Sequence, residues 1–311
     1  MSGKKIGFLG LGTMGGPMAR NLLKSGHEVR GFDLDADALA RHKEAGGTTA
    51  GSPREAAEGM DIIMSVLPDG PDVERALLGP DGAIHTMTPG TVFIDASTID
   101  PAVTIRVGEA LAARGIDSVD CPLGKTSDHA VAGTLTLIVG GSPEVVERIR
   151  PVLECVGKDF FYCGRLGMGQ AMKLTNNFLS AAILTSTVEA LVMGAKAGLS
   201  LETMMSVMRT TMAWNNHLGV SLPKKALADD FTPGFMVRLA EKDQRLAMQF
   251  ADSLNAAVPV GTAVHETLKE ALRGGFANLD VSAVMQLRER QAGVRVRAGD
   301  AAADPHTSAV A

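Results

Sequence analysis

The feature that most constrains the fold is a glycine-rich turn between a short apolar run and a helical segment at the start of the chain. Residues 6–9 have the length and composition of a buried strand, and they are followed by Gly10-Leu11-Gly12-Thr13-Met14-Gly15. A G-x-G-x-x-G pattern in that context is typical of a dinucleotide-binding βαβ unit. We expect Gly10 to allow the turn, Gly12 to let a pyrophosphate approach the backbone, and Gly15 to let helix and strand pack closely.

An acidic residue after the second predicted strand indicates which dinucleotide binds. Asp33 follows the strand predicted over residues 28–32, about 18 residues after the last glycine of the turn. A carboxylate there accepts hydrogen bonds from the ribose hydroxyls and repels a 2′-phosphate, which favours NAD over NADP. Arg30 lies close in sequence and could reach a 2′-phosphate instead. Thr13 and Met14 open the first helix, where free N–H groups suit phosphates. A methyltransferase loop, or a glycine-rich turn of an unrelated α/β protein, remains an alternative.

The first half of the chain alternates short apolar runs with segments of helical periodicity. Continuous apolar strands separated by helices predict parallel βαβ units, and therefore a doubly wound Rossmann-type α/β domain over residues 1–165. From residue 166 the periodicity is helical, which predicts an all-α domain over residues 166–298 that begins with a long helix over residues 170–197. Residues 299–311 are expected to form a disordered tail. The strands are predicted over residues 6–9, 28–32, 62–66, 92–95, 116–119, 134–139 and 160–162, and the first helices over residues 17–25, 101–114 and 143–155.

Composition and charge exclude several classes of protein. The 311 residues carry a net charge of -5, and 4% of them are aromatic. With no basic run, this balance argues against a nucleic-acid partner. The most apolar stretch, residues 178–199, contains Glu189 and Lys196, which favours a buried helix over a membrane span. The three cysteines have no paired or zinc-binding spacing and no secretory signal is visible, so we expect a cytoplasmic protein without a metal.

Three further motifs follow the glycine-rich turn. They are Phe93-Ile94-Asp95-Ala96-Ser97-Thr98, then Gly167-Met168-Gly169-Gln170-Ala171-Met172-Lys173-Leu174-Thr175-Asn176-Asn177, and finally Lys242-Asp243. In this order the four motifs resemble the β-hydroxyacid dehydrogenase family, which includes 3-hydroxyisobutyrate dehydrogenase and tartronate semialdehyde reductase. The resemblance covers about residues 5–291. It implies an enzyme that passes a hydride between NAD and a small anionic hydroxy acid or its aldehyde.

The resemblance assigns roles to residues in these motifs. Lys173 is implied as the acid that protonates the alkoxide formed when an aldehyde accepts a hydride. Asn177, four residues later on the same helix face, is implied to orient the substrate. From spacing alone, the two side chains could equally be the polar face of a long helix. The other implied contacts are Ser97 and Asn176 for the substrate, and Leu67, Pro68, Thr98 and Lys242 for the cofactor.

The substrate loop, residues 120–127, departs from the family's usual pattern. Most members carry Asp-Ala-Pro-Val-Ser-Gly-Gly, whereas this chain has Asp120-Cys121-Pro122-Leu123-Gly124-Lys125-Thr126-Ser127. The loop resembles that of the sulfolactaldehyde reductases, which carry Gly-Arg-Thr-Ser there. We expect Lys125 to anchor an anionic substrate, with Gly124 and Thr126 beside it, and we favour a sulfonate. Because lysine lacks the fork of arginine, 3-hydroxyisobutyrate, γ-hydroxybutyrate and tartronate semialdehyde remain alternative substrates. An ordinary solvated surface lysine also remains open.

Two further expectations concern activity and assembly. A non-catalytic NAD-sensing module would keep the glycine-rich turn but would not need Lys173 and Asn177 together. The helix over residues 170–197 is too apolar for one small helical domain to cover, which predicts a homodimer or homotetramer. Phe235 and Asn215 are candidate pocket residues from the helical domain.

Overall fold

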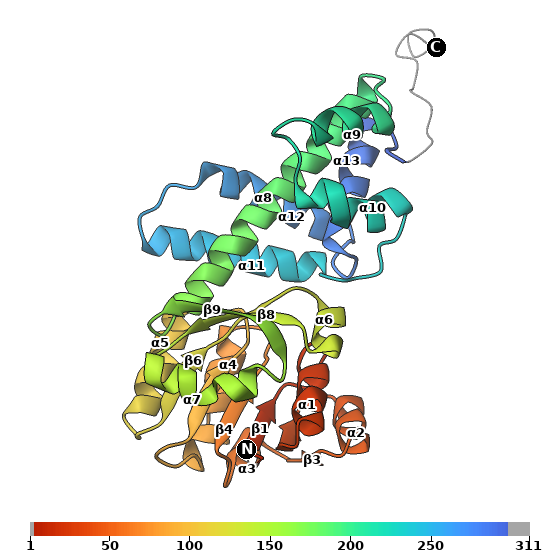
Figure 1. The fold of residues 1–311 in the computed structure, drawn as a ribbon. Coiled ribbons are helices and arrows are strands. Elements are labelled where there is room, and N and C mark those ends of the chain that lie inside the picture. Colours follow the sequence, from red (N-terminus) through yellow and green to blue (C-terminus); the bar gives the residue numbers. More distant parts are fainter. Residues whose placement is uncertain (1–2, 298–311) are drawn as a thin grey trace. The chain divides into compact units, whose positions relative to one another are not determined.

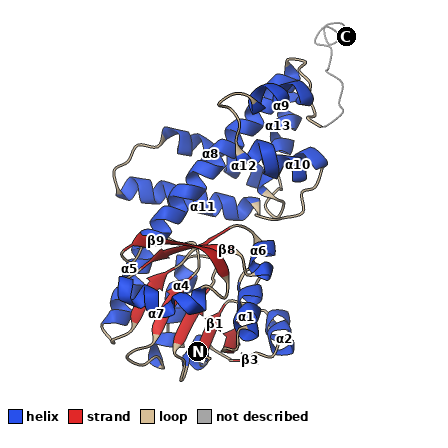
Figure 2. Cartoon of the chain, viewed as in Figure 1, coloured by secondary structure: helices blue, strands red, loops and turns tan. Residues whose placement is uncertain are grey.

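The structure, a computed structural model, describes residues 3–297 and divides into two compact units. The strands lie in the first unit, which ends at Leu174, and the second unit is built from helices (Figures 1 and 2). This confirms the predicted α/β unit followed by an all-α unit. The division falls within α8 (Met168–Lys196), and the predicted boundary at residues 165–166 lies just before that helix. The tail predicted over residues 299–311 lies outside the described residues.

The described residues of the first unit form one sheet of nine strands. These are β1 (Lys5–Leu9), β2 (Glu28–Phe32), β3 (Thr48–Thr49), β4 (Ile62–Ser65), β5 (Val92–Asp95), β6 (Asp117–Asp120), β7 (Leu123–Gly124), β8 (Leu135–Gly140) and β9 (Gly157–Gly164). Their order is β3-β2-β1-β4-β5-β6-β8-β7, and β9 also pairs with β8. The order reverses at β1, which lies between β2 and β4. Ligands of doubly wound sheets bind at such a point, beyond the carboxyl ends of the strands.

Helices cover both faces of the sheet. Successive residues of a strand point to opposite faces, so neighbouring residues of one strand pack against different helices. Ile62 and Met64 of β4 pack in one apolar core with α1, α2, α6 and α7, whereas Ile63 packs in another with α3, α4 and α5. The strands therefore carry continuous apolar runs, as the sequence indicated. The helices are α1 (Gly15–Lys24), α2 (Ala36–Glu44), α3 (Pro53–Ala57), α4 (Gly70–Leu78), α5 (Pro101–Ala112), α6 (Ser127–Ala132) and α7 (Pro143–Leu153).

One part of the sheet differs from the prediction of parallel units. The strands from β1 to β6 are parallel, but β8 runs antiparallel to β6 and β7. The connection from β6 to β8 contains β7 and the six-residue helix α6. A helix of that length spans about 9 Å, whereas a six-residue strand spans about 20 Å. The helix is therefore too short to return the chain to the other end of the sheet, and β8 runs back beside β7.

The second unit has its own apolar core around the C-terminal part of α8. Leu184, Val188 and Leu191 of this helix are buried among side chains of the other helices. By length and composition alone, α8 would also pass as a membrane span. These three side chains, however, belong to a protein core. The helices are α9 (Leu201–Arg209), α10 (Leu222–Lys224), α11 (Val237–Ser253), α12 (Pro259–Arg273) and α13 (Val284–Ala292).

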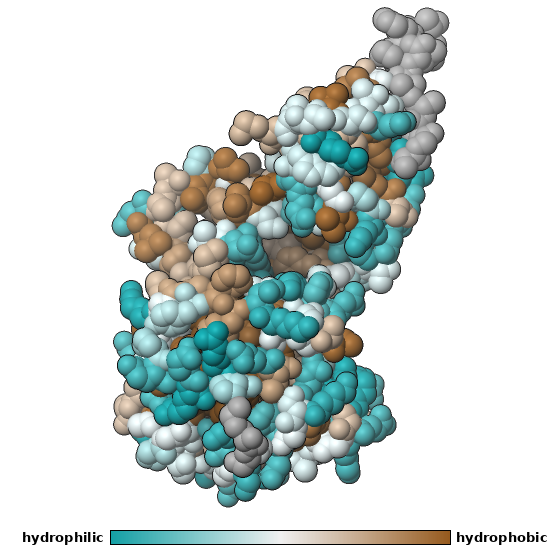
Figure 3. Space-filling model, in the orientation of Figure 1, coloured by the Kyte–Doolittle hydropathy of each residue, from teal (hydrophilic) through white to brown (hydrophobic). Residues whose placement is uncertain are grey.

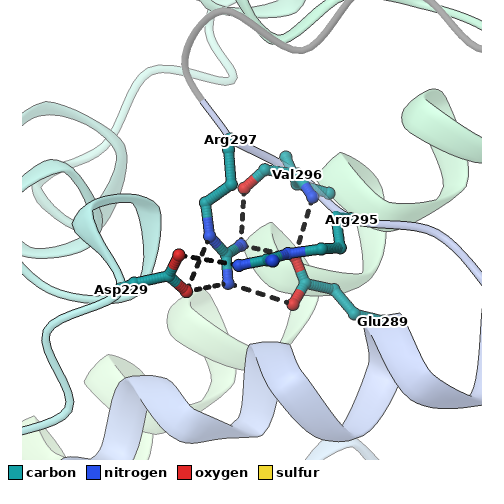
Figure 4. A network of polar contacts seen from close by, with 5 residues as sticks. All are labelled: Asp229, Glu289, Arg295, Val296 and Arg297. Atoms are coloured by element: carbon teal, nitrogen blue, oxygen red, sulfur yellow. Dashed lines mark hydrogen bonds and ion pairs between the residues drawn. The ribbon is translucent and has the colours of Figure 1, made fainter.

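Ion pairs hold the last described residues of the second unit (Figure 4). Arg297 donates to a carboxylate oxygen of Asp229 at 2.6 Å and to one of Glu289 at 2.6 Å. The side chains of Arg297 and Glu289 are 11% and 6% exposed, so this pair is shielded from water. Arg295 also pairs with Asp229, whose pKa is lowered chiefly by the hydrogen bond from Arg297. The network therefore joins residues 295–297 to α13 and to the loop at Asp229.

Candidate active site

The glycine-rich turn, residues 10–15, lies at the carboxyl end of β1. Gly10 has a φ of +93°, and its N–H donates to the carbonyl oxygen of Phe32 at 2.9 Å. A Cβ atom on Gly15 would collide with the carbonyl oxygen of Gly10, whereas a Cβ atom on Gly12 would meet nothing within 4 Å. The turn is thus closely packed on the helix side and open at Gly12. This shape fits a pyrophosphate lying against the backbone.

The start of α1 is open to an anion. No side chain caps the helix at Met14, and its first turn contains no acidic residue. Thr13 is exposed and Met14 is half-buried. The uncapped N–H groups and the positive end of the helix dipole favour a phosphate group at this point.

Asp33 lies beside the turn and holds part of it in place. Its Oδ2 accepts the backbone N–H of Leu11 at 2.6 Å, and its Oδ1 accepts the N–H two residues farther on. Arg30 points elsewhere, since its Nη1 donates at 3.0 Å to two backbone carbonyls at the end of α3. A ribose would therefore meet a carboxylate, and the nearby guanidinium is occupied. The residues of this region fit NAD.

The loops after β4 and β5 are joined by Ser97. Its Oγ accepts the N–H of Leu67 at 2.9 Å, and its own N–H donates to Oδ1 of Asp95 at 3.0 Å. Ser97 is 2% exposed, so its hydroxyl contacts the neighbouring loop rather than the surface. The predicted cofactor contacts Pro68 and Thr98 are the next residues of these two loops.

Lys173 contacts the substrate loop. Its Nζ donates to the carbonyl oxygen of Leu123 at 2.7 Å. Leu123 pairs with Leu137 of β8, and the preceding carbonyl, that of Pro122, accepts the N–H of Ile138. Hydrogen-bonded and non-hydrogen-bonded pairs alternate along an antiparallel ladder, so the Leu123 carbonyl points away from β8. The ammonium of Lys173 therefore lies on that outer side of β7.

Buried polar side chains fix the start of α8. The Asp120 carboxylate is fully buried and accepts the N–H groups of Gly167 and Gln170, each at 2.7 Å. Burial raises the pKa of Asp120 to about 7. The Gln170 amide donates to the carbonyl oxygen of Ser97 at 2.8 Å. These contacts tie the ends of β5 and β6 to the helix that carries Lys173. The sequence analysis gave no positioning role to Asp120 or to Gln170, although Asp120 directly follows a predicted strand.

Lys125 has a left-handed backbone, with a φ of +76°. Its Nζ donates to the carbonyl oxygen of Thr134 at 2.9 Å and pairs with Oδ2 of Asp159 at 2.7 Å. Sequence reasoning did not identify this acidic partner. Gly124 pairs with β8, and Oγ1 of Thr126 lies 3.0 Å from a ring nitrogen of His129. The substrate loop therefore directs its ammonium toward β9.

In the second unit, α8 and α11 bring polar groups together. Asn177 Nδ2 donates to Oδ2 of Asp243 at 2.7 Å, and Nζ of Lys242 lies 3.3 Å from Oδ1 of the same carboxylate. Asn176 donates its own amide to Asn177 Oδ1 at 3.1 Å. Asp243 is 4% exposed. Its carboxylate therefore contacts both Asn177 of α8 and Lys242 of α11. The sequence analysis named Asp243 within the Lys242-Asp243 motif but gave it no role.

The remaining candidate residues lie within the second unit. Asn215 donates to the hydroxyl of Thr187 at 3.1 Å, and Phe235 packs against the apolar core. Over residues 3–297, no cluster of three or more His, Cys, Asp or Glu side chains could hold a metal ion.

Comparison with known proteins identifies the family. The profile of the NAD binding domain of 6-phosphogluconate dehydrogenase matches residues 5–164, and that of the NAD-binding domain of NADP-dependent 3-hydroxyisobutyrate dehydrogenase matches residues 167–288. The chain is 37% identical to the 3-sulfolactaldehyde reductase of Escherichia coli (strain K12), over 94% of this chain and 97% of that protein. The chain belongs to the β-hydroxyacid dehydrogenase family.

Two further similarities show that family members named for different substrates have comparable sequence identity to this chain. This β-hydroxyacid dehydrogenase is 38% identical to the 3-hydroxyisobutyrate dehydrogenase of Pseudomonas aeruginosa, over 91% of this chain and 97% of that protein. A solved structure of Mycobacterium tuberculosis 3-hydroxyisobutyrate dehydrogenase with L-serine is 33% identical. It has a TM-score of 0.87 and covers 92% of this chain and 99% of that one. The protein is therefore an oxidoreductase that uses NAD, while its substrate is a separate question.

Proposed function

We propose that this dehydrogenase reduces a small anionic semialdehyde, and that its substrate is 3-sulfolactaldehyde, which becomes 2,3-dihydroxypropane-1-sulfonate. The observation that carries the proposal is the hydrogen bond from Lys173 Nζ to the carbonyl oxygen of Leu123 at 2.7 Å. It puts the candidate acid next to the loop segment Gly124-Lys125-Thr126, which carries a cation. Acid and anion-binding loop are thus parts of one arrangement.

The residues of α8 handle the proton. When bound, NADH supplies the hydride to the aldehyde carbon. Lys173 then gives a proton to the new alkoxide. Asn177 lies one turn farther along the helix and orients the substrate oxygen. In the oxidative direction, a neutral Lys173 would take the proton back.

The substrate loop supports a sulfonate. A sulfonate has three oxygens, and the loop offers backbone N–H groups, the hydroxyl of Thr126 and the ammonium of Lys125. The similarity to the E. coli 3-sulfolactaldehyde reductase favours the same reading. The second candidate is a carboxylate such as 3-hydroxyisobutyrate, supported by the similarity to the P. aeruginosa enzyme. Lys125 could serve either anion in place of its present partner, Asp159.

The test is a panel of three aldehydes assayed with NADH: sulfolactaldehyde, succinic semialdehyde and a neutral aldehyde. Lys125→Ala should lower kcat/KM for the preferred anionic aldehyde about ten- to a hundredfold, because a charged hydrogen bond is worth roughly 1.5–3 kcal/mol. It should cost the neutral aldehyde little, and Lys125→Arg should keep sulfonate turnover. Equal losses on charged and neutral substrates would show that Lys125 does not bind the anion.

We also propose that the protein works as a homodimer or homotetramer in the cytoplasm, without nucleic-acid or membrane partners. On α8, Leu179 and Met193 are 58% and 71% exposed, and apolar side chains gather on the surface of the second unit (Figure 3). Apolar surface of this kind is typical of protein interfaces. Light scattering at micromolar concentration should give a mass of at least two chains, and a monomer would contradict the proposal.

A further inference from the structure

The substrate loop holds its cation in a strained backbone position. Lys125 has a φ of +76°, in the left-handed region that glycine adopts freely. The family's usual loop carries glycine at this point. A non-glycine residue stays there when its surroundings over-determine it, and such residues gather at functional sites. The ammonium at the end of this side chain binds the Thr134 carbonyl oxygen at 2.9 Å and the Asp159 carboxylate at 2.7 Å.

The side chain of Lys125 reaches across β8. Gly124 of β7 pairs with Thr136 of β8, which in turn pairs with Asp159 of β9, so the three residues form a row across three strands. The Thr136 hydroxyl lies 3.4 Å from the same Asp159 oxygen that Lys125 binds. Two strand spacings put the ends of this row about 10 Å apart.

The ammonium of Lys173 lies on the other side of β7. It binds the Leu123 carbonyl, which points away from β8. The two ammonium groups are therefore separated by a distance on the order of 10 Å. The ammonium of Lys125 is already neutralised by the Asp159 carboxylate, so the anion of a substrate gains its full attraction only where it replaces that carboxylate.

The ion pair is placed where it can exchange partners. The side chains of Lys125 and Asp159 are 34% and 49% exposed, and ion pairs at such positions contribute little to stability. The hydrogen bond from Lys125 lowers the pKa of Asp159, so the carboxylate is charged at neutral pH. An incoming anion therefore competes with one weakly held carboxylate.

We propose that Asp159 is a specificity-determining residue that occupies Lys125 in the resting enzyme and is replaced there by the anion of the substrate. This inference rests on the proposed reduction of an anionic aldehyde. The anion of the substrate takes the place of the Asp159 carboxylate and draws the ammonium of Lys125 away from β9. A neutral aldehyde leaves the ion pair intact and gains nothing from Lys125.

The test is Asp159→Asn, which removes the charge and keeps the size of the side chain. KM for the preferred anionic aldehyde should fall about two- to tenfold with kcat unchanged, and KM for the neutral aldehyde should stay the same. The matched control is Asp117→Asn, which breaks an exposed ion pair with Arg148 at the opposite end of β6. This control should alter neither KM.

Two further measurements isolate the exchange. Inorganic sulfate should inhibit Asp159→Asn at a lower concentration than it inhibits the wild type. In a Lys125→Ala background, Asp159→Asn should have no additional effect. The proposal is overturned if Asp159→Asn leaves the anionic KM unchanged, shifts charged and neutral substrates alike, or acts without Lys125. If sulfate inhibition shifts as expected but sulfolactaldehyde is a poor substrate, only the sulfonate assignment fails.

Discussion

The glycine-rich turn and the substrate loop both sit at strand ends of the same sheet, yet they are held in opposite ways. Backbone contacts fix the first, since Gly15 packs against the carbonyl oxygen of Gly10. Exposed side chains hold the second, through the ion pair of Lys125 with Asp159. A family built this way can keep one cofactor site unchanged while its substrate loop varies. The comparison separates changes that affect every substrate from changes that affect selectivity.

The largest expected effect comes from Lys173, which contacts the substrate loop and yet should act on every substrate. Its substitution therefore does not follow the division between a shared cofactor site and a selective loop. Lys173→Ala should lower kcat about a hundred- to ten-thousandfold on charged and neutral aldehydes alike, the usual contribution of a general acid. NADH affinity, measured by fluorescence titration, should stay close to the wild-type value. Lys196→Ala, at the exposed end of the same helix, is the control and should retain activity. Near-normal turnover in Lys173→Ala would place the acid elsewhere.

The second prediction sharpens the account of the glycine-rich turn. Gly12→Ala should fold normally because its Cβ atom meets nothing within 4 Å, but it should weaken NADH binding at least about tenfold by occupying the pyrophosphate position. Gly15→Ala should instead lower the free energy of unfolding by about 1–3 kcal/mol, because its Cβ atom collides with the carbonyl oxygen of Gly10. Urea unfolding and NADH titration of both variants check this. Equal stability losses would mean that the turn is packed alike at both glycines.

The third prediction concerns cofactor choice at the same turn. The wild type should use NADH far better than NADPH, because Asp33 lies beside the turn and Arg30 is occupied by backbone carbonyls. Asp33→Ala should lower the ratio of kcat/KM with NADH to kcat/KM with NADPH about three- to tenfold, because it removes a charge that repels the 2′-phosphate. The change should appear mainly in the affinity for the cofactor. Steady-state kinetics with both cofactors measure it. Equal use of the two cofactors by the wild type would refute the assignment of Asp33.

The last prediction tests how the beginning of the substrate loop is held. Burial raises the pKa of Asp120 to about 7, so below that pH the folded protein keeps a proton that the unfolded chain, with a pKa of about 3.9, has released. The contribution of Asp120 to the free energy of unfolding therefore falls as pH rises from about 4 to 7 and is constant above that. Urea unfolding at pH 5 and pH 8 should show the wild type losing stability relative to Asp120→Asn. If the difference in unfolding free energy between the two proteins did not change with pH, the raised pKa of Asp120 would be contradicted.

What the sequence could reveal depends on how local each requirement is. The glycine-rich turn was predictable because its pattern is contiguous in the sequence and Gly15 packs against the carbonyl oxygen of Gly10, five residues earlier. The placement of Lys173 and Asn177 one turn apart on α8 is local in the same way. The direction of β8 was not predictable from apolar periodicity, because it depends on the length of α6. That length became visible only in the structure.

The contacts that complete the site are long-range. The Asp120 carboxylate meets an N–H 47 residues away, and Lys125 meets Asp159 34 residues away. Neither pair leaves a periodic signal in the sequence. The left-handed backbone at Lys125 was equally hidden, although the glycine usual in the family loop is the residue that such a backbone favours.

The hydrogen bond from Lys173 to the Leu123 carbonyl has a consequence for redesign. Grafting a relative's loop onto this scaffold would move the carbonyl that orients the proton donor, together with the residues that recognise the anion. A graft chosen only to change substrate selectivity would thus also change the rate of the chemical step. Compensating changes for such a graft belong on the first turns of α8, outside the exchanged segment.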